Sequence, residues 1–539
     1  MAIFKKYKMN KFLTLTGLLV ITLLGSYLRL ADLEIKPNGL YVDEASTGVN
    51  AWSILQTGKD EYGKQYPLAF RFLGSYTPPL YTYLTALSIN FFGFSIGSIR
   101  LVSAVSGILM IPLMFFLIRM LKISKSDLIP LIGSLLFAIC PWSIFYSRIG
   151  YEINLAFLLY FIGVLFLFIS LKSKIFLILA FGVLGLSVNA YHTQRMLSPL
   201  TLIVFLTLYK DVVFQAKYRI FLIIAIVLFT IFLLPQLYLL TTPAGLNRAK
   251  GVFYSQFLSS PYFLIREFSA QYLSYFSPRN LFFQPDPDLQ RSLPELSVFY
   301  PWMAMPFLTG LFFLIKENIF HKKFILMLLL LTPIPASLTG DPFATQRALP
   351  FLPPVLLVIC IVIKKVLDKY KKVGLPAILL LIALSLLYLY RSYATFLPSE
   401  RAAIWGYGFK QLAEKIKQNP DKKYVIDNAR TKPAYIELAF YLKIPPSILQ
   451  ASVDQNIKDS YYTKTNWDGY YRLLNFETRA INWEKDIYQK QILAGDELSI
   501  SEAQAREHFL TKVFEIKSPI GEIIFRGFET NPEEKFKSL

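Results

Sequence analysis

The sequence predicts a polytopic α-helical membrane protein with a soluble α/β domain at its C-terminal end. Of the 539 residues, 54% are hydrophobic and only 17% are charged, whereas a soluble domain carries about 25% charged residues. The apolar residues are gathered into long runs that short basic segments connect. Beyond about residue 390 the sequence becomes charged and rich in tyrosine, without a run long enough to cross a bilayer.

The apolar runs predict about eleven transmembrane helices. Lys and Arg collect in every second connecting segment, and such segments stay on the cytoplasmic side. This pattern predicts a multi-pass protein of the plasma membrane with a cytoplasmic N-terminus and an extracytoplasmic C-terminus. The predicted spans are 12–30, 95–118, 128–147, 153–171, 174–190, 196–209, 219–240, 299–315, 324–338, 348–363 and 373–390.

The net charge of +20 is also compatible with a nucleic-acid partner. The basic residues, however, cluster in short connections between apolar runs, such as 119–125, 210–219 and 364–372. That distribution is typical of membrane orientation rather than of a binding stripe. We therefore expect no nucleic-acid partner.

The segment from Pro78 to Gly93 is apolar but short. The stretch between its prolines and Gly93 has about fourteen residues, too few for a helix to cross a ~30 Å hydrocarbon core. Counting it as a span would also invert the charge pattern of every later loop. We expect a juxtamembrane helix that lies against the outer face.

The tail 391–539 is expected to form an extracytoplasmic α/β domain of about 150 residues. KKYVID predicts a strand, ARTKPAYIELAFYLK a helix and EIIFRGFE a closing strand. The tail has no glycine-rich phosphate loop, nucleophile elbow or metal-ligand spacing. We expect it to cover a site or receive an acceptor, while 1–390 forms the transmembrane module.

The predicted topology places several polar residues on the outer face. Asp43 and Glu44 lie in the first outer loop, 31–94, and a second long outer loop covers 241–298. A site assembled from several loops on one face is typical of a membrane enzyme. The other candidates are Arg148 and Glu152 in SRIGYEIN, Tyr191 and Arg195 in NAYHTQR, and Arg347 in TGDPFATQR.

These residue types fit sugar transfer from a lipid phosphate, which needs a carboxylate base and cations for the departing phosphate. Asp43 stays ionised at the water boundary near neutral pH, so we predict it to be the general base. Arg195 and Arg347 are suited to bidentate phosphate contact. Alternatively, both arginines snorkel at the interface, and Glu152 pairs with Arg148 four residues earlier.

The region from Arg29 to Leu101 contains RLADLEIKPNGLYVDEASTGVNAW, TPPLYTYL and FGFSIGSIRL. It resembles the first outer loop of the GT-C glycosyltransferases and is most similar to their family 39 branch, which includes protein O-mannosyltransferases and the lipid A aminoarabinose transferase. The resemblance implies a GT-C fold, a polyprenyl-phosphate sugar as donor and Asp43 as the base. It continues through SRIGYEINLAF, where Glu152 is similar in position to the family's second acidic residue, and more weakly to about residue 360.

One departure concerns the lipid phosphate. Where the aminoarabinose transferase has a phosphate-binding lysine before the juxtamembrane helix, this chain reads YTPPLY. The phosphate ligand is therefore expected elsewhere, at Arg195 or Arg347. Further candidates are Arg148 and Tyr191 for substrate contacts, and Glu44 and Glu152 for orienting the acceptor.

We predict an inverting glycosyltransferase that contacts membrane lipid. It moves a sugar from a polyprenyl-phosphate donor to a hydroxyl group of a protein, lipid or glycan on the outer face of the membrane. No cofactor is expected, although a divalent metal stays open. The alternatives are a lipid-linked sugar transporter or flippase without chemistry, and a metal-dependent oligosaccharyltransferase. Asp286 and Asp288 are interpreted as a solvated turn, and His192 as a lone histidine rather than a metal ligand.

Overall fold

The computed structural model describes residues 11–246, 260–319, 321–429, 434–465 and 469–537. Contacts divide the chain into two compact units. Unit 1 contains Met1–Leu33 and Arg100–Ala394, and unit 2 contains Glu34–Ile99 and Thr395–Leu539. The first outer loop thus packs with the C-terminal domain. The boundary between Ala394 and Thr395 lies close to the change in composition near residue 390.

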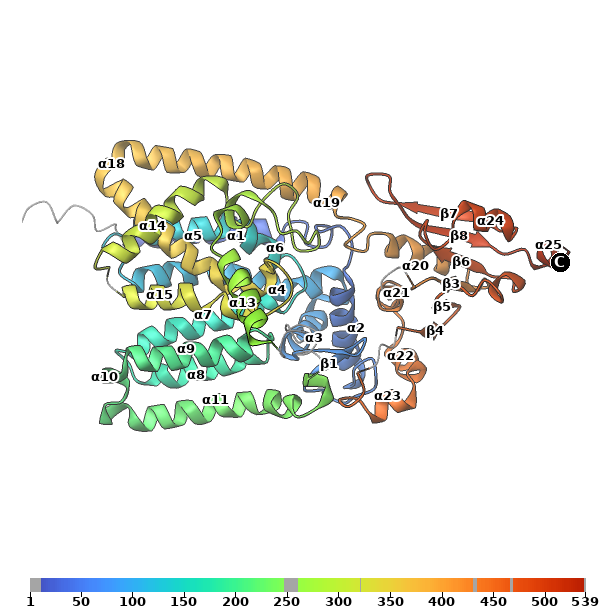
Figure 1. Cartoon of the computed structure of the whole chain (residues 1–539), viewed down its shortest axis with the longest axis horizontal. Coiled ribbons are helices and arrows are strands. Elements are labelled where there is room, and N and C mark those ends of the chain that lie inside the picture. The colour runs from blue at the N-terminus through green and yellow to red at the C-terminus, as the bar shows by residue number, and fades with distance from the viewer. Residues whose placement is uncertain (1–10, 247–259, 320, 430–433, 466–468, 538–539) are drawn as a thin grey trace, which may run out of the picture. The chain divides into compact units, whose positions relative to one another are not determined.

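Unit 1 is a bundle of helices (Figure 1). Each apolar run that was predicted to span the membrane is largely helical, but the runs 128–147, 299–315, 324–338 and 348–363 are each divided between consecutive helical elements. The helices are α1 (Lys11–Leu30), α4 (Ile96–Met120), α5 (Leu128–Ile139), α6 (Pro141–Ser147), α7 (Ile153–Ser170), α8 (Ile175–Val188), α9 (Gln194–Leu208), α10 (Lys210–Val213), α11 (Arg219–Leu240), α13 (Pro261–Ser274), α14 (Ala304–Lys316), α15 (Lys322–Leu331), α16 (Ile334–Ser337), α17 (Thr345–Ala348) and α18 (Leu352–Leu389).

The protein is a multi-pass membrane protein. Within the described ranges, five helices are long and apolar enough to cross a membrane, or six if the bent pair α5 and α6 forms one span. Helices α5 and α6 meet at 55°. In α18, Tyr370 leaves the helical conformation with φ −128° and ψ 42°, which separates the two runs predicted at 348–363 and 373–390.

Glycines allow neighbouring helices of unit 1 to approach closely. A Cβ atom on Gly163 of α7 would lie 2.5 Å from Cγ of Leu184 on α8. A Cβ atom on Gly182 of α8 would lie 2.7 Å from a methyl group of Leu228 on α11. Close packing through small residues is typical of membrane helices, since lipid leaves little hydrophobic drive for helix association.

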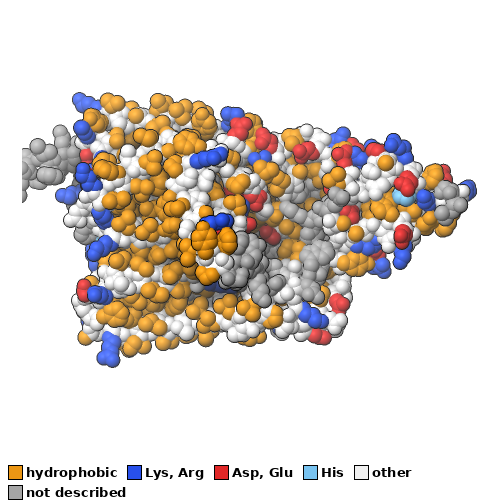
Figure 2. Space-filling view, viewed as in Figure 1, with side chains coloured by type: hydrophobic (Ala, Val, Ile, Leu, Met, Phe, Trp, Pro, Cys, Tyr) orange, Lys and Arg blue, Asp and Glu red, His pale blue; other side chains and the backbone are white. Residues whose placement is uncertain are grey.

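The surface of unit 1 has an apolar belt and a basic end. Figure 2 shows hydrophobic side chains spread over the helices on the visible face, and exposed apolar residues of α11 include Ile220, Ile223 and Val227. Lys and Arg side chains gather at the end of the bundle where α10 and the bend of α18 lie (Figures 1 and 2). This arrangement is typical of a lipid-facing bundle with one basic side. Which side faces the cytoplasm stays a prediction.

The N-terminal part of unit 2 contains α2 (Val42–Thr57), the antiparallel strands β1 (Phe70–Phe72) and β2 (Ser75–Thr77), and α3 (Leu80–Phe92). The short helix predicted between Pro78 and Gly93 is confirmed as α3, which has 13 residues. Ala51 of α2 packs with Ala86 and Ile89 of α3 in a small apolar core. The position of α3 against the outer face of a membrane stays a prediction.

The C-terminal part of unit 2 is built on a mixed sheet with the strand order β4-β5-β3-β6-β8-β7 (Figure 1). KKYVID forms β3 and EIIFRGFE forms β8, as predicted, and the predicted helix is α21 in its described residues. Strand β3 pairs in parallel with both β5 and β6. The elements are α19 (Leu397–Glu400), α20 (Gly408–Gln418), β3 (Tyr424–Ile426), α21 (Tyr435–Leu442), α22 (Pro446–Ser452), α23 (Gln455–Asp459), β4 (Tyr471–Leu473), β5 (Phe476–Thr478), β6 (Ile492–Gly495), α24 (Glu502–Glu507), β7 (Thr511–Lys517), β8 (Ile523–Glu529) and α25 (Pro532–Lys537).

Candidate active site

Asp43 lies in the first turn of α2, and its side chain is exposed. The neighbouring Leu40, Val42 and Ala45 are buried, so the helix is fixed on one side and presents Asp43 on the other. The positive end of a helix dipole stabilises an ionised carboxylate in the first turn. Asp43 is therefore an exposed carboxyl group at the surface of unit 2.

Glu44 is completely buried, in contrast to Asp43. Its Oε2 atom accepts a hydrogen bond from the backbone N–H of Tyr41 at 3.2 Å. The backbone N–H of Ala45 donates to the Tyr41 carbonyl at 2.9 Å. Glu44 thus satisfies a donor at the start of α2, as the acidic residue of a capping box does.

A buried carboxylate holds α2 against the C-terminal part of unit 2. The Asn50 side chain of α2 donates to Oε1 of Glu61 at 2.9 Å, and the Glu61 N–H donates back to Oδ1 of Asn50 at 3.0 Å. Oε2 of Glu61 accepts from the Tyr435 hydroxyl at 3.1 Å. Because both oxygens of Glu61 accept hydrogen bonds, a shift of α2 would leave a buried carboxyl oxygen without its partner.

Asp60 forms a second buried anchor beside the first. Its Oδ1 accepts from the backbone N–H groups of Tyr62 and Lys64, and its Oδ2 accepts from the Tyr461 hydroxyl at 2.5 Å. Burial raises the pKa of the Asp60 carboxyl to about 6, although these hydrogen bonds lower it. This carboxyl therefore titrates near pH 6.

The residues just before α2 cross a later segment at very short range. Gly39 has φ +121° and Gly406 has φ +75°, conformations that favour glycine. A Cβ atom on Gly406 would lie 2.6 Å from the Leu40 carbonyl oxygen. The Tyr41 ring packs at 5.6 Å from the Trp405 ring. The start of α2 is thereby fixed to the segment that leads into α20.

Arg148 supports the end of α1 in unit 1. It is 1% exposed, and its guanidinium donates to the Leu28 carbonyl at 2.9 Å and to the Ala31 carbonyl at 2.5 Å. The guanidinium also lies 4.9 Å from the centre of the Tyr393 ring. Glu152 is half-buried at the start of α7. The described contacts of Arg148 are structural ones.

Tyr191 and Arg195 lie at the turn between α8 and α9, where Tyr191 is buried and Arg195 is partly exposed. Arg195 belongs to the first turn of α9, and the ring of His192 lies 6.1 Å from that of Tyr191. A guanidinium at a helix start adds to the positive end of the helix dipole. This turn therefore favours an anion such as a phosphate.

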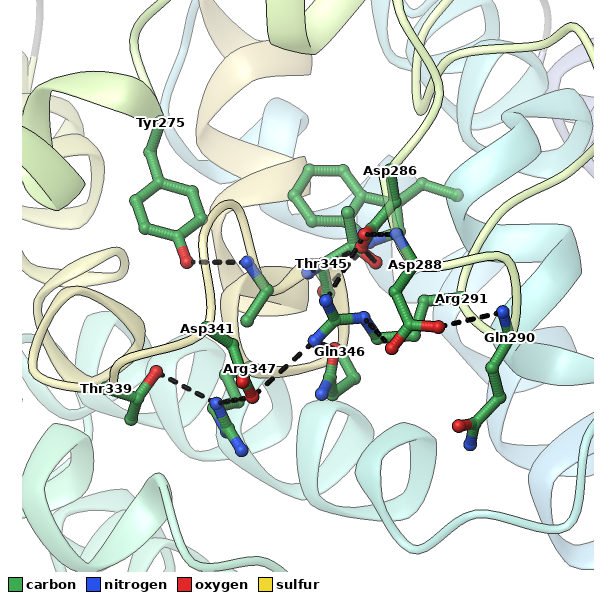
Figure 3. A network of polar contacts seen from close by, with 12 residues as sticks. Tyr275, Asp286, Asp288, Gln290, Arg291, Thr339, Asp341, Thr345, Gln346 and Arg347 are labelled. Carbon is green, nitrogen blue, oxygen red and sulfur yellow. Dashed lines mark hydrogen bonds and ion pairs between the residues drawn. The ribbon is translucent and has the colours of Figure 1, made fainter. Parts of the chain in front are cut away.

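Three segments of unit 1 meet in a polar network (Figure 3). Arg291 is 8% exposed, and its guanidinium lies 3.3 Å from Oδ1 of the buried Asp286 and 3.2 Å from Oδ2 of Asp288. Its Nη1 lies 3.7 Å from Oδ2 of Asp341, and that carboxylate also pairs with Arg347. These ion pairs thus join the loop that contains residues 286–291 to the loop that contains residues 341–347.

Hydroxyl and amide groups extend this network. The Thr345 hydroxyl donates to Oδ2 of Asp286 at 2.7 Å, and the Tyr146 hydroxyl lies 2.7 Å from the Thr345 hydroxyl. The Gln290 side chain donates to the Tyr151 hydroxyl. The turn after α6, the loop before η5 (Pro301–Met303) and the turn that carries Arg347 therefore lie together.

The interpretation of Asp286 as part of a solvated turn is wrong. Asp286 is 2% exposed, and burial raises the pKa of its carboxyl although the Arg291 charge lowers it. Asp288 is closer to the prediction, since its side chain is 43% exposed. The acidic run followed by Arg291 three residues after Asp288 is the sequence signal that could have indicated an ion-pair network.

Arg347 is engaged within the same cluster. Its Nη1 donates to the Thr339 hydroxyl at 2.9 Å and pairs with Asp341. In the described cluster two guanidinium groups face the carboxylates of Asp286, Asp288 and Asp341. A phosphate here would meet more negative than positive charge, so this cluster is poorly suited to hold a phosphate.

Among the residues that the structure describes, no group of three or more His, Cys, Asp or Glu side chains is arranged to hold a metal ion. Cys140 and Cys360 are buried and reduced. Whether the reaction uses a divalent metal stays open.

The fold of the chain matches solved structures, whereas the two sequence comparisons find no match. No protein-family model matches it, and a comparison with curated proteins finds no match. ArnT from Cupriavidus metallidurans bound to undecaprenyl phosphate matches with a TM-score of 0.58 at 12% identity, over 96% of this chain and 98% of ArnT. ArnT in the apo state gives a TM-score of 0.55 at 11% identity over the same shares. The chain has the GT-C fold.

The predicted GT-C fold with a C-terminal α/β domain is thereby confirmed. The oligosaccharyltransferase from Archaeoglobus fulgidus in complex with zinc and sulfate matches with a TM-score of 0.49 at 11% identity, over 94% of this chain and 72% of that one. The match with ArnT shows a shared fold, and a shared fold does not fix an activity.

Replacing Arg291 should destabilise the protein strongly. In Arg291→Gln the buried Asp286 loses its counter-charge, so the free energy of unfolding should fall by about 3 kcal/mol. Arg391→Gln is the matched control, since its ion pair with Glu295 is exposed and contributes less than about 1 kcal/mol. Thermal unfolding in detergent compares the two. Equal losses would contradict a stabilising role for the buried pair.

Protonation of Asp60 should make stability depend on pH. The folded-state pKa of about 6 exceeds the ordinary value of 3.8, so the folded protein is stabilised by the protonated Asp60 carboxyl. This stabilisation is complete below pH 3.8 and is lost as the pH rises through 6. Lowering the pH from about 7.5 to about 5 should stabilise wild type by roughly 1 kcal/mol more than Asp60→Asn. The exposed Asp421→Asn should follow wild type. If the free energy of unfolding changed with pH in the same way in wild type and Asp60→Asn, the raised pKa of Asp60 would be contradicted.

Proposed function

We propose that the protein is an inverting glycosyltransferase that transfers a sugar from a polyprenyl phosphate to an acceptor hydroxyl, with Asp43 as the general base. The carrying observation is an exposed aspartate in the first turn of the helix that follows α1, in a chain with the GT-C fold. The relative that shares this fold over nearly its whole length binds undecaprenyl phosphate. A lipid-phosphate donor also suits a multi-pass membrane protein.

The reaction is a single displacement at the anomeric carbon. The acceptor oxygen forms a bond to that carbon, and the bond from the carbon to the phosphate oxygen breaks. The hydroxyl proton passes to the Asp43 carboxylate, and the phosphate leaves as polyprenyl phosphate. Attack on the face opposite to the phosphate inverts the configuration of the sugar. Asp43 suits this task because a surface carboxylate is ionised near neutral pH.

Among the arginines, Arg195 is proposed to bind the donor phosphate. Arg148 is buried on backbone carbonyls, and Arg347 shares a cluster in which carboxylates outnumber guanidinium groups. Arg195 combines partial exposure with the first turn of α9. Its guanidinium would stabilise the charge that develops on the leaving phosphate.

Glu44 is proposed to act on α2 rather than on the substrate, since its described contact is with the backbone of Tyr41. Glu152 is kept as a group that orients the acceptor. The outer face of the plasma membrane is proposed as the place of the reaction, because the basic segments of the sequence lie on the opposite side of the predicted spans.

Loss of the Asp43 carboxylate should abolish most of the activity. In proteoliposomes that contain a radiolabelled polyprenyl-phosphate sugar, Asp43→Asn should lower the transfer rate by about 10²- to 10⁴-fold. The control is Glu34→Gln, an exposed carboxylate of the same loop, which should transfer at the wild-type rate. Equal turnover by wild type and Asp43→Asn would rule out the assignment. Movement of the lipid across the bilayer without transfer would instead indicate a flippase.

Replacing Arg195 should weaken the use of the donor. Arg195→Gln should raise the KM for the lipid donor and lower kcat, while Arg195→Lys should retain part of both because it keeps the charge. Arg119→Gln is the control, since Arg119 is an exposed arginine paired with Asp127. Kinetics in the same proteoliposomes separate these cases. An unchanged KM and kcat in Arg195→Gln would remove Arg195 from the phosphate site.

A further inference from the structure

Unit 2 contains a crevice of about 430 Å³ beside the start of α2. Its volume falls within the roughly 300–1,000 Å³ that is typical of ligand pockets. One wall is formed by Tyr41 and Val42, the two residues that precede Asp43, and by Gly406 from the segment packed against them. Ile523, Ile524 and Phe525 at the start of β8 also line it. The crevice thus lies next to the proposed general base.

The sheet topology gives a reason for a crevice at this place. Leu493 of β6 and Phe528 of β8 pack with Ala505 of α24 on one face of the sheet. Phe525 of β8 packs with Phe409 of α20 on the other face, and α20 packs with α21. The helix that follows β3 and the helix that follows β6 therefore lie on opposite faces.

Strands β3 and β6 are parallel neighbours, so their connections diverge at their carboxyl ends. Ligands of open α/β sheets bind in the crevice that such a divergence creates. Asp496 directly follows β6, and Glu437 lies in α21, the helix after β3; both line the crevice. The strand topology and the lining residues of the crevice therefore indicate the same position for a ligand, at the carboxyl ends of β3 and β6.

The lining is acidic in a protein that is basic as a whole. Glu437, Asp496 and Glu522 contribute carboxylates, and no Lys, Arg or His occurs among the described residues that line the crevice. The net charge of the chain is +20, so the charge of the described lining residues is opposite in sign to that of the whole chain. A site of this charge attracts cations and repels the phosphate groups of lipids.

The rest of the lining is apolar and includes Val42, Ile404, Phe409 and Ile524. A lysine or arginine side chain has an aliphatic stem and a charged head, so it matches apolar walls that end in carboxylates. An amino sugar carries hydroxyl groups around its ring and would leave them facing these apolar side chains. The lining therefore favours a basic polypeptide over an aminated glycan.

We propose that this crevice binds a lysine or arginine side chain of a polypeptide acceptor, so that a hydroxyl residue near the basic residue is presented to Asp43. This inference rests on the proposed glycosyltransferase function for its purpose, but the binding itself does not depend on catalysis. The acceptor class would then be hydroxyl residues within basic segments of proteins.

The binding test uses the full-length protein in detergent and a fluorescein-labelled peptide, Gly-Lys-Gly-Ser-Gly-Lys-Gly. Wild type should bind this peptide more tightly than the same peptide with glutamines in place of lysines, and added salt should weaken the binding. Glu522→Gln should raise Kd about two- to fivefold, and Glu522→Lys about tenfold. Glu522 is exposed, so these changes leave the fold intact. Fluorescence anisotropy measures the affinity.

Glu533→Gln is the matched control, since Glu533 is an exposed glutamate of α25 that does not line the crevice. It should bind the lysine peptide as wild type does. Equal affinity for the lysine and glutamine peptides would overturn the proposal. So would an equal effect of Glu522→Lys and Glu533→Gln, or displacement of the lysine peptide by a chitosan oligomer but not by unlabelled peptide.

The transfer assay separates this inference from the proposed function. If Asp43→Asn abolishes transfer while Glu522→Lys transfers equally to the lysine and glutamine peptides at the wild-type rate, the crevice proposal fails and the function stands. If the lysine peptide binds in a Glu522-dependent manner but no donor is turned over, the binding site stands and the function fails. A selective loss of transfer to the lysine peptide in Glu522→Lys supports both.

Discussion

The arrangement of unit 2 depends on a carboxylate that has been removed from water. Glu61 is buried between the amide of Asn50 on α2 and the hydroxyl of Tyr435 on α21. An isolated buried carboxylate is strongly unfavourable, and its hydrogen bonds offset that cost only while all partners are in place. Asp60 with Tyr461 repeats the arrangement one residue earlier in the chain. The hydrogen bonds of the two acids therefore fix the position of the first outer loop, and the position of Asp43 with it.

Local patterns in the sequence were sufficient for much of the fold. The apolar runs and the lysines between them predict the helices of unit 1, and the short run after the paired prolines predicts α3. Strands β3 and β8 lie within the segments KKYVID and EIIFRGFE, which were predicted as strands. The strand order does not follow from sequence, because β3 pairs on both sides with strands that come later in the chain. The shared unit of 34–99 and 395–539 escapes local reasoning for the same reason.

The site was predictable only where a residue's role depends on its own neighbours. The place of Asp43 after the first apolar run makes it a candidate, and its role stays a prediction. Arg148 and Arg195 look alike in sequence, yet Arg148 donates to a carbonyl 120 residues away. Asp286 accepts a hydrogen bond from Thr345 across 59 residues, although its run looks like a solvated turn in the sequence. Such pairings depend on tertiary contacts and leave no periodic trace in the sequence.

The hydrogen bond between Asp60 and Tyr461 joins residues 401 positions apart, and this has a consequence for the order in which the protein matures. At translation rates of about 5–20 residues per second, the ribosome needs roughly 20–80 s to make Tyr461 after Asp60. During that interval the first outer loop has been synthesised, but the tyrosines whose hydroxyls donate to its two buried acids have not. The helix that carries Asp43 therefore reaches its final position only after nearly the whole chain has been made, so a truncated or stalled chain would contain the proposed base without its support.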